Sequence, residues 1–281
     1  MLAYKVSLVI FMAGSLLDMG LRLNVRDALK GLRDGVFVAH TLFWCFVFCP
    51  ALAWGLTRIM PIDGPYATGL LLLGMAPCAP FAPIFVSKAK GDLGYTAAFM
   101  VLAAVGTVIF MPLALPLMVK GLTTTAWAIA KPLLVVVILP MAAGVLVQGK
   151  SAPLAARLQP FVKKITGMFA LLWCVLALVI YGKSLLGVAG TFAVATQLLF
   201  FSGIFLATTL LSFGLSPERK VALGVGTTTR NLGACLAPLL AVPDMDPRAS
   251  LMILLGLPVM VLVIRLGTKL LAGRSLPATS V

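Results

Sequence analysis

The chain has 281 residues, of which 61% are hydrophobic, and it carries a formal net charge of +14, with 8 acidic residues against 22 lysines and arginines. Soluble domains reach only about 45–50% apolar residues, so this composition excludes a water-soluble fold. The basic residues lie in short gaps between apolar runs, which argues against nucleic-acid binding. One histidine, and five cysteines without a CxxC spacing, argue against a zinc site, a disulfide framework and a hydrolytic triad.

Apolar runs divide the chain into about nine predicted membrane helices, because about 20 apolar residues are needed to cross a hydrocarbon layer of about 30 Å. Charged or Pro/Gly-rich breaks place the runs at residues 2–21, 35–56, 66–87, 94–119, 126–147, 165–182, 191–215, 221–242 and 249–271. The sequence therefore predicts an all-α polytopic membrane protein. The mixed segment 151–166 is interpreted either as a helix on the membrane surface or as a solvated loop.

The lysines and arginines predict the orientation. Gaps after the first, third, fifth, seventh and ninth runs hold 15 of the 22, whereas the opposite side holds 6. The positive-inside rule then places the N-terminus outside and the C-terminus in the cytoplasm, with the protein in the inner, cytoplasmic membrane. The remaining basic residue, Arg230, lies in the middle of run 221–242.

Run 66–87 is interrupted by Pro77, Pro80 and Pro83, which are spaced by three. Each proline removes a backbone donor and clashes with the preceding turn, so we predict two half-helices joined by extended backbone. Irregular backbone at that depth is tolerated only where protein buries it or water lines it.

Run 221–242 is interrupted by polar and small residues. They are Gly224, Gly226, Thr227, Thr228, Thr229, Arg230, Asn231 and Gly233. A guanidinium in a membrane costs about 2.5–3.5 kcal/mol on insertion scales, so Arg230 is a candidate functional group. The alternative is a structural arginine that satisfies carbonyls of the broken helix.

The two interrupted runs enter the membrane from opposite sides, and each precedes an apolar run that contains proline. This pattern predicts an inverted repeat whose discontinuous helices meet near the midplane with half-helix N-termini facing an anionic group. We predict a first repeat of four helices at 1–121 and a second of five at 122–281. The predicted core consists of 66–119 and 221–271 with their neighbours.

Three strings carry a resemblance to a known family. They are MGLRL at 19–23, GMAPCAPFAPIFVSKAKGD at 74–92 and TTTRNLGACLAPLL at 227–240. In their order and spacing they resemble the bile acid:sodium symporter superfamily, which also includes arsenite permeases. The resemblance implies two inverted five-helix repeats with two crossing broken helices, the first helix being absent here. It also implies a secondary active transporter that works by alternating access.

The positions that match sodium ligands of the family depart from its pattern. A Ser-Asn pair in the first broken helix is matched by Ala82 and Pro83, and a Glu in the second is matched by Gly226. Asn231 is retained, and Thr107 stands near a hydroxyl ligand position. These departures imply sodium sites that are altered or absent.

A Gln that precedes the matched Asn in the family is replaced here by Arg230. We hypothesise that Arg230 takes the electrostatic role of a sodium ion and helps bind an organic carboxylate, with Thr227–Thr229 beside it. The expected partners are a small anionic substrate and membrane lipid, and sodium or a proton is a possible coupling ion. No cofactor, metal or catalytic residue is expected, and the oligomeric state is left open.

Two alternatives stay open at this point. Cys78 matches a cysteine of the arsenite permeases, which implies metalloid efflux, and a membrane enzyme or sensor is the alternative from another class. Asp18, near the end of run 2–21, either reaches the interface, pairs with a basic group or carries a coupling proton.

Overall fold

A computed structural model describes residues 2–119, 125–188, 191–241 and 246–274. Seven helical stretches are long and apolar enough to cross a membrane: Leu2–Arg22, Gly35–Ile59, Leu93–Met118, Ala126–Lys150, Ala152–Ser184, Ala193–Leu211 and Pro247–Leu270. The described residues contain no named strand. The prediction of an all-α polytopic membrane protein is thus confirmed. The two other predicted runs each form a pair of shorter helices separated by non-helical residues.

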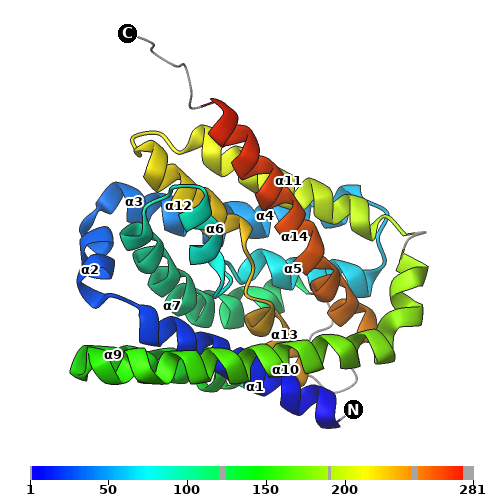
Figure 1. The fold of residues 1–281 in the computed structure, drawn as a ribbon. Helices are drawn as coiled ribbons and strands as arrows, with labels where there is room; N and C mark the ends of the chain where they lie inside the picture. The colour runs from blue at the N-terminus through cyan, green and yellow to red at the C-terminus, as the bar shows by residue number, and fades with distance from the viewer. Residues whose placement is uncertain (1, 120–124, 189–190, 242–245, 275–281) are drawn as a thin grey trace.

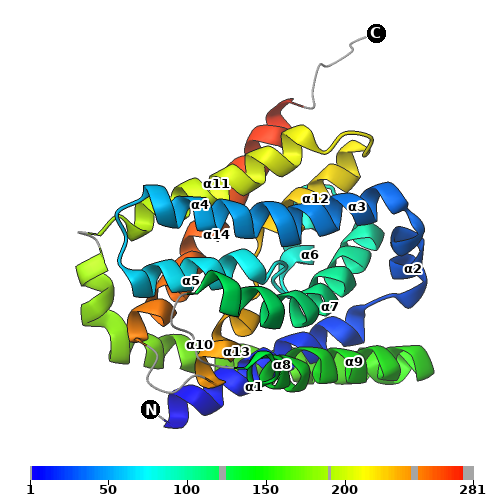
Figure 2. The ribbon, with the colours of Figure 1, turned by 180° about the vertical axis from the view of Figure 1, so that it is seen from behind.

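One layer of the fold, which we call the panel layer, consists of α1 (Leu2–Arg22), α8 (Ala126–Leu133), α9 (Leu139–Lys150) and α10 (Ala152–Gly187). Figures 1 and 2 show α1, α9 and α10 side by side beneath the rest of the molecule. The helices α1 and α9 approach so closely that a Cβ on Gly144 would lie 2.6 Å from the carbonyl oxygen of Leu17. Small residues allow such close packing between membrane helices.

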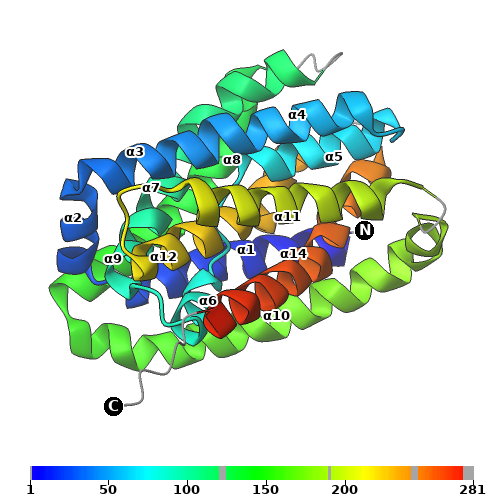
Figure 3. The same cartoon turned by 90° about the horizontal axis from the view of Figure 1, so that it is seen from above.

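The second layer, which we call the core layer, packs on the panel layer and contains both broken runs. Its helices are α3 (Gly35–Phe43), α4 (Cys49–Ile59), α5 (Gly64–Met75), α6 (Ala82–Lys88), α7 (Leu93–Met118), α11 (Ala193–Leu211), α12 (Pro217–Thr228), α13 (Leu232–Ala241) and α14 (Pro247–Arg274). Figure 3 shows α3 and α4 as one rod alongside α11. A π-helical turn, η1 (Trp44–Phe48), joins α3 to α4 just before Pro50, and a second, η2 (Leu134–Ile138), joins α8 to α9 just before Pro140.

The structure corrects two expectations about segments between the runs. Residues 151–166 are neither a loop nor a separate surface helix, because α10 begins at Ala152 and continues through Pro160. A short helix, α2 (Val25–Arg33), also lies in the first basic gap, where none was predicted. The Asn24 side chain caps it by accepting hydrogen bonds from the N–H groups of Arg26 and Asp27.

The predicted division into repeats stays a prediction. Its boundary between residues 121 and 122 lies outside the described residues.

Candidate functional site at the helix crossing

The two broken runs meet where their non-helical residues pair. The backbone N–H of Cys78 donates to the carbonyl of Thr229 at 2.7 Å, and the N–H of Asn231 donates to the carbonyl of Ala76 at 3.0 Å. Pro77 and Arg230 stand opposite each other in this short antiparallel bridge. The two interruptions predicted from the sequence are therefore in direct contact.

The bridge explains how prolines are accommodated at this depth. Its hydrogen bonds come from the residues flanking Pro77, so the missing N–H of that proline leaves no gap in the pairing. Cys78 has a φ of 69°, in the left-handed region that non-glycine residues seldom adopt. Backbone strain of this kind clusters at functional sites.

The guanidinium of Arg230 is fully buried within the core layer. Its Nη2 donates to the Sγ of Cys49 at 2.9 Å, and its Nη1 lies 3.5 Å from the carbonyl oxygen of Gly74. The ring of Phe200 lies 5.4 Å from the guanidinium carbon, within the range of a cation–π interaction. The Nε atom is buried and has no hydrogen-bond partner in the described part of the chain.

No carboxylate neutralises this charge within the described residues. The ion pairs found there join other basic residues to acids, namely Arg22 to Asp18, Lys30 to Asp27, Arg219 to Asp34, and Arg248 to Asp63 and Asp246. An unpaired buried charge is expensive, so an arginine held this way indicates a site that attracts an anion.

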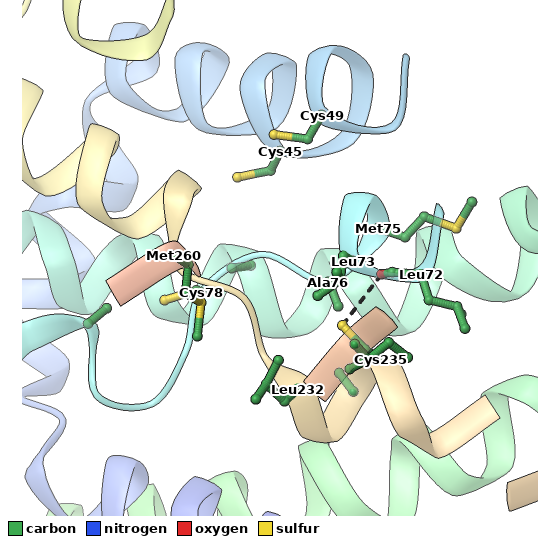
Figure 4. Packing of buried hydrophobic residues seen from close by; sticks show 14 of the residues in the cluster. Cys45, Cys49, Leu72, Leu73, Met75, Ala76, Cys78, Leu232, Cys235 and Met260 are labelled. Carbon is green, nitrogen blue, oxygen red and sulfur yellow. Dashed lines mark hydrogen bonds between the residues drawn. The ribbon is translucent and has the colours of Figure 1, made fainter. Parts of the chain in front are cut away.

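Thiols and hydroxyls surround the crossing, as Figure 4 shows for Cys45, Cys49, Cys78 and Cys235. The hydroxyl of Thr228 donates to Gly224, and that of Thr229 donates to Gly226 while accepting the N–H of Ala79. The threonine hydroxyls therefore support the broken helix itself. No group of three His, Cys, Asp or Glu residues able to hold a metal ion occurs in the described ranges.

A cavity of about 110 Å³ lies between the crossing and the panel layer. Its walls come from α1, α10, α13, α14 and both breaks: Phe11, Met12, Ser15, Leu16, Pro80, Phe81, Ala170, Trp173, Cys174, Arg230, Asn231, Leu232, Gly233 and Leu257. The partners of the Arg230 guanidinium, Cys49, Gly74 and Phe200, do not line it. The charge therefore lies behind the crossing, away from the cavity walls formed by α1 and α10.

The cavity surface is mostly apolar, and its polar border lies at the break before α13, where Arg230 and Asn231 stand. The Oδ1 of Asn231 accepts the N–H of Ala234 at 3.1 Å, which fixes the side-chain amide as a helix cap. Within the described residues, the side-chain amide nitrogen of Asn231 and the backbone N–H groups of Leu232 and Gly233 donate no hydrogen bond. A helix N-terminus with free donors favours a negatively charged ligand.

Three of the predicted site residues line the cavity, and the others do not. Pro80, Arg230 and Asn231 border it. The predicted residues Pro77, Ala82, Pro83, Thr107, Gly226, Thr227, Thr228 and Thr229 lie outside its wall. Phe11, Phe81 and Trp173 could not be predicted as cavity residues, because an aromatic residue in an apolar run looks the same whether it faces lipid, core or cavity.

Asp18 and Cys78, two further residues considered from the sequence, do not line the cavity. Asp18 pairs with Arg22 one turn later on α1 and accepts a hydrogen bond from Gln159 of α10 at 2.8 Å, so it occupies a partnered position rather than a free one. The thiol of Cys78 contacts the carbonyl of Ala79 and does not border the cavity.

The sequence model of the sodium bile acid symporter family matches residues 8–188. The chain belongs to the sodium bile acid symporter family. It is 24% identical over 239 residues to the probable sodium/metabolite cotransporter BASS2, chloroplastic, of Oryza sativa subsp. japonica. It is 26% identical over 243 residues to the probable sodium/metabolite cotransporter BASS1, chloroplastic, of Arabidopsis thaliana. Both alignments cover 82% of this chain.

A bacterial relative is the uncharacterized sodium-dependent transporter YocS of Bacillus subtilis, which is 24% identical over 251 residues, or 84% of this chain and 77% of that protein. The chain spans 57% and 60% of the lengths of the rice and Arabidopsis relatives. The resemblance seen in the three strings is confirmed. The printed names of these relatives describe transporters.

The ring of Phe99 packs against Gly226, the position expected to match a family carboxylate. A Cβ on Gly226 would lie 2.7 Å from the nearest atoms of the Phe99 ring, so no larger side chain fits there without movement of Phe99. Thr107 is buried, and its hydroxyl donates to the carbonyl of Ala103 at 2.7 Å. Ala82 and Pro83, at the start of α6, offer no side-chain oxygen.

Proposed function

We propose that the protein is a secondary active transporter that carries a small organic anion by alternating access. The observation that carries this proposal is the cavity between the panel layer and the crossing. It is bordered by Asn231, Leu232 and Gly233, and within the described residues the Asn231 side-chain amide and the N–H groups of Leu232 and Gly233 donate no hydrogen bond. A carboxylate only accepts hydrogen bonds, and it matches such a wall better than a cation or a neutral donor does.

Arg230 provides the positive charge that this proposal needs. Two unit charges about 8 Å apart attract by about 2 kcal/mol at an effective dielectric constant of about 20. A guanidinium behind the crossing can therefore favour an anion in the cavity without touching it. In this role Arg230 replaces a bound sodium ion, and we propose that transport does not require sodium.

Three features support independence from sodium. A sodium ion needs several oxygen ligands, whereas Ala82 and Pro83 provide none from their side chains, and the place of a carboxylate at Gly226 is occupied by Phe99. A fixed guanidinium at the crossing would also repel a bound cation.

The experiment is uptake of labelled monocarboxylates by purified protein in liposomes, with sodium replaced by potassium in a parallel series. The wild type is expected to take up a carboxylate equally in both series. Arg230→Gln is expected to weaken affinity by about tenfold or more, from the loss of about 2 kcal/mol of attraction. Arg230→Lys, which keeps the charge, is the matched variant and is expected to retain more affinity than Arg230→Gln.

The proposal fails if Arg230→Gln leaves both the affinity for the carboxylate and the pH dependence of uptake unchanged. It also fails if wild-type uptake stops when sodium is withdrawn. Thermal unfolding of each variant in detergent separates a loss of binding from a loss of folding.

We also propose that the protein lies in the cytoplasmic membrane with its N-terminus outside. The excess of lysine and arginine in alternate gaps supports this orientation. Single cysteines placed at exposed Lys5 and at exposed Lys150, in a variant lacking the native cysteines, test it with a membrane-impermeant thiol reagent on whole cells. Labelling at position 150 instead of position 5 would reverse the assignment.

A further inference from the structure

The wall opposite the donors is aromatic. Phe11 of α1 and Trp173 of α10 stack with ring centroids 5.6 Å apart and an interplanar angle of 16°, and both border the cavity. Phe81, in the first break, adds a third ring. Rings in offset-stacked arrangements favour another flat ring against their faces.

The rest of the wall is aliphatic except for one hydroxyl and one thiol. Met12, Leu16 and Leu257 supply apolar surface, and the hydroxyl of Ser15 donates to the carbonyl of Phe11 at 2.7 Å. The cavity thus has one polar end and an apolar body. Its volume of about 110 Å³ is of the same order as the engineered cavity of about 150 Å³ that binds benzene.

Charge restricts the ligand further. Arg230 is the one basic residue among those that border the cavity, within the described part of the chain. A second carboxylate would lie against aromatic and aliphatic side chains without donors, and burying an unpaired charge there is strongly unfavourable. The cavity therefore favours a single negative charge at one end of an apolar molecule.

We propose that the substrate is a monocarboxylate with a flat, apolar body of about one ring, such as an aryl carboxylate. This inference rests on the proposed transport of an organic anion through the same cavity. The carboxylate lies at the start of α13, and the ring lies against Phe11 and Trp173.

The test measures competition for uptake, and thermal stabilisation of the purified protein, with benzoate, lactate and succinate as probes. Benzoate is expected to bind at least tenfold more tightly than lactate, and succinate is expected to bind more weakly than either. If lactate or succinate competes as well as benzoate, the inference is wrong while the proposed function stands. If none of the three binds, the proposed function fails as well.

Variants of the wall test the placement of the ring. Phe11→Leu keeps apolar volume but removes a ring, and it is expected to weaken benzoate by about five- to tenfold without changing lactate. Phe161→Leu is the matched control, because Phe161 lies on α10 but is 68% exposed. If Phe11→Leu and the wild type bind benzoate with equal affinity, and lactate binding is also unchanged, the placement of the ligand ring against Phe11 is wrong.

Discussion

Phe99 of α7 and Gly226 of α12 fit together so that each position determines what the other can hold. Two ring atoms of Phe99 would lie 2.7 Å from a Cβ at position 226, closer than such contacts normally come. Gly226→Glu alone is therefore expected to lower thermal stability, because overpacking a core typically costs about 1–3 kcal/mol. Thermal unfolding in detergent measures the effect.

Removing the Phe99 ring and placing a carboxylate at position 226 is expected to make uptake depend on sodium. In the triple variant Phe99→Ala, Gly226→Glu and Arg230→Gln, a carboxylate replaces the ring and the guanidinium is removed. We expect uptake by this variant to rise severalfold when potassium is replaced by sodium. Phe99→Ala alone is the control and should show no sodium effect. A triple variant that folds and transports equally in both salts would contradict our account of this site.

The thiol of Cys49 is expected to stabilise the buried guanidinium. Cys49→Ala removes the acceptor of Arg230 Nη2, and loss of a hydrogen bond to a buried charged group typically costs about 1–3 kcal/mol. Cys49→Ser keeps an acceptor and should be closer to the wild type in melting temperature. Cys174→Ala, at a partly exposed thiol, is the control. Equal melting temperatures for Cys49→Ala and Cys174→Ala would show that the contact contributes nothing.

The hydroxyl of Thr229 links the two breaks through a side chain. It accepts the N–H of Ala79 at 3.2 Å and donates to the carbonyl of Gly226 at 3.0 Å. Thr229→Val keeps the shape but leaves the Ala79 N–H without this acceptor, so a loss of about 1–3 kcal/mol is expected. Thr268→Val is the control, because that hydroxyl bonds only within its own helix. Circular dichroism melts of both variants in one detergent provide the comparison.

Gly233 is expected to keep the polar end of the cavity open. A Cβ there would lie 2.7 Å from Cγ of Met12, a flexible side chain that also borders the cavity. Gly233→Ala should therefore fold but displace Met12 and weaken carboxylate binding severalfold. Gly149→Ala, where a Cβ meets nothing within 4 Å, is the control. Unchanged uptake kinetics in Gly233→Ala would show that the ligand does not reach this end.

A cluster at one end of the core layer is expected to make stability depend on pH. Asp34 caps α3, accepts a hydrogen bond from Tyr95 at 2.8 Å and pairs with Arg219 at 2.9 Å. The backbone N–H of Phe37 lowers the pKa of Asp34, and Tyr95, Arg219 and the N–H of Val36 add to this effect.

The sign of the effect follows from the lowered pKa. The stabilisation is fully present above the ordinary pKa of 3.8, and it is lost as the pH falls through the lower pKa of the folded protein. Asp34→Asn should therefore melt at a lower temperature than the wild type at neutral pH, and the difference should shrink in acid. A difference that stays constant from neutral pH to pH values below the ordinary pKa would contradict this.

The broken runs could be predicted from the sequence because their signals are local. Three prolines spaced by three, and a cluster of glycine, threonine and arginine in an apolar run, each prevent a continuous helix. The surroundings of Arg230 could not be predicted, since Cys49 and Phe200 come from distant parts of the chain and reach it only through packing.

The continuous course of α10 and the presence of α2 were not predicted, for a different reason. The start of α10 mixes charged and apolar residues around Pro160, a pattern that indicates a break, yet the helix continues because it packs along α1. The helix α2 has only nine residues, and its stability depends on the Asn24 cap and on packing against α7. Short helices of this kind are marginal without tertiary contacts.

The bridge at the crossing also limits how the molecule can move. Separating Ala76 from Asn231 and Cys78 from Thr229 would expose four backbone groups where neither lipid nor solvent replaces them. The two breaks must therefore travel as one rigid unit. Since the cavity proposed to hold the substrate lies between that unit and the helices α1 and α10, we expect access to switch sides by sliding of the unit along these helices, with the bridge intact.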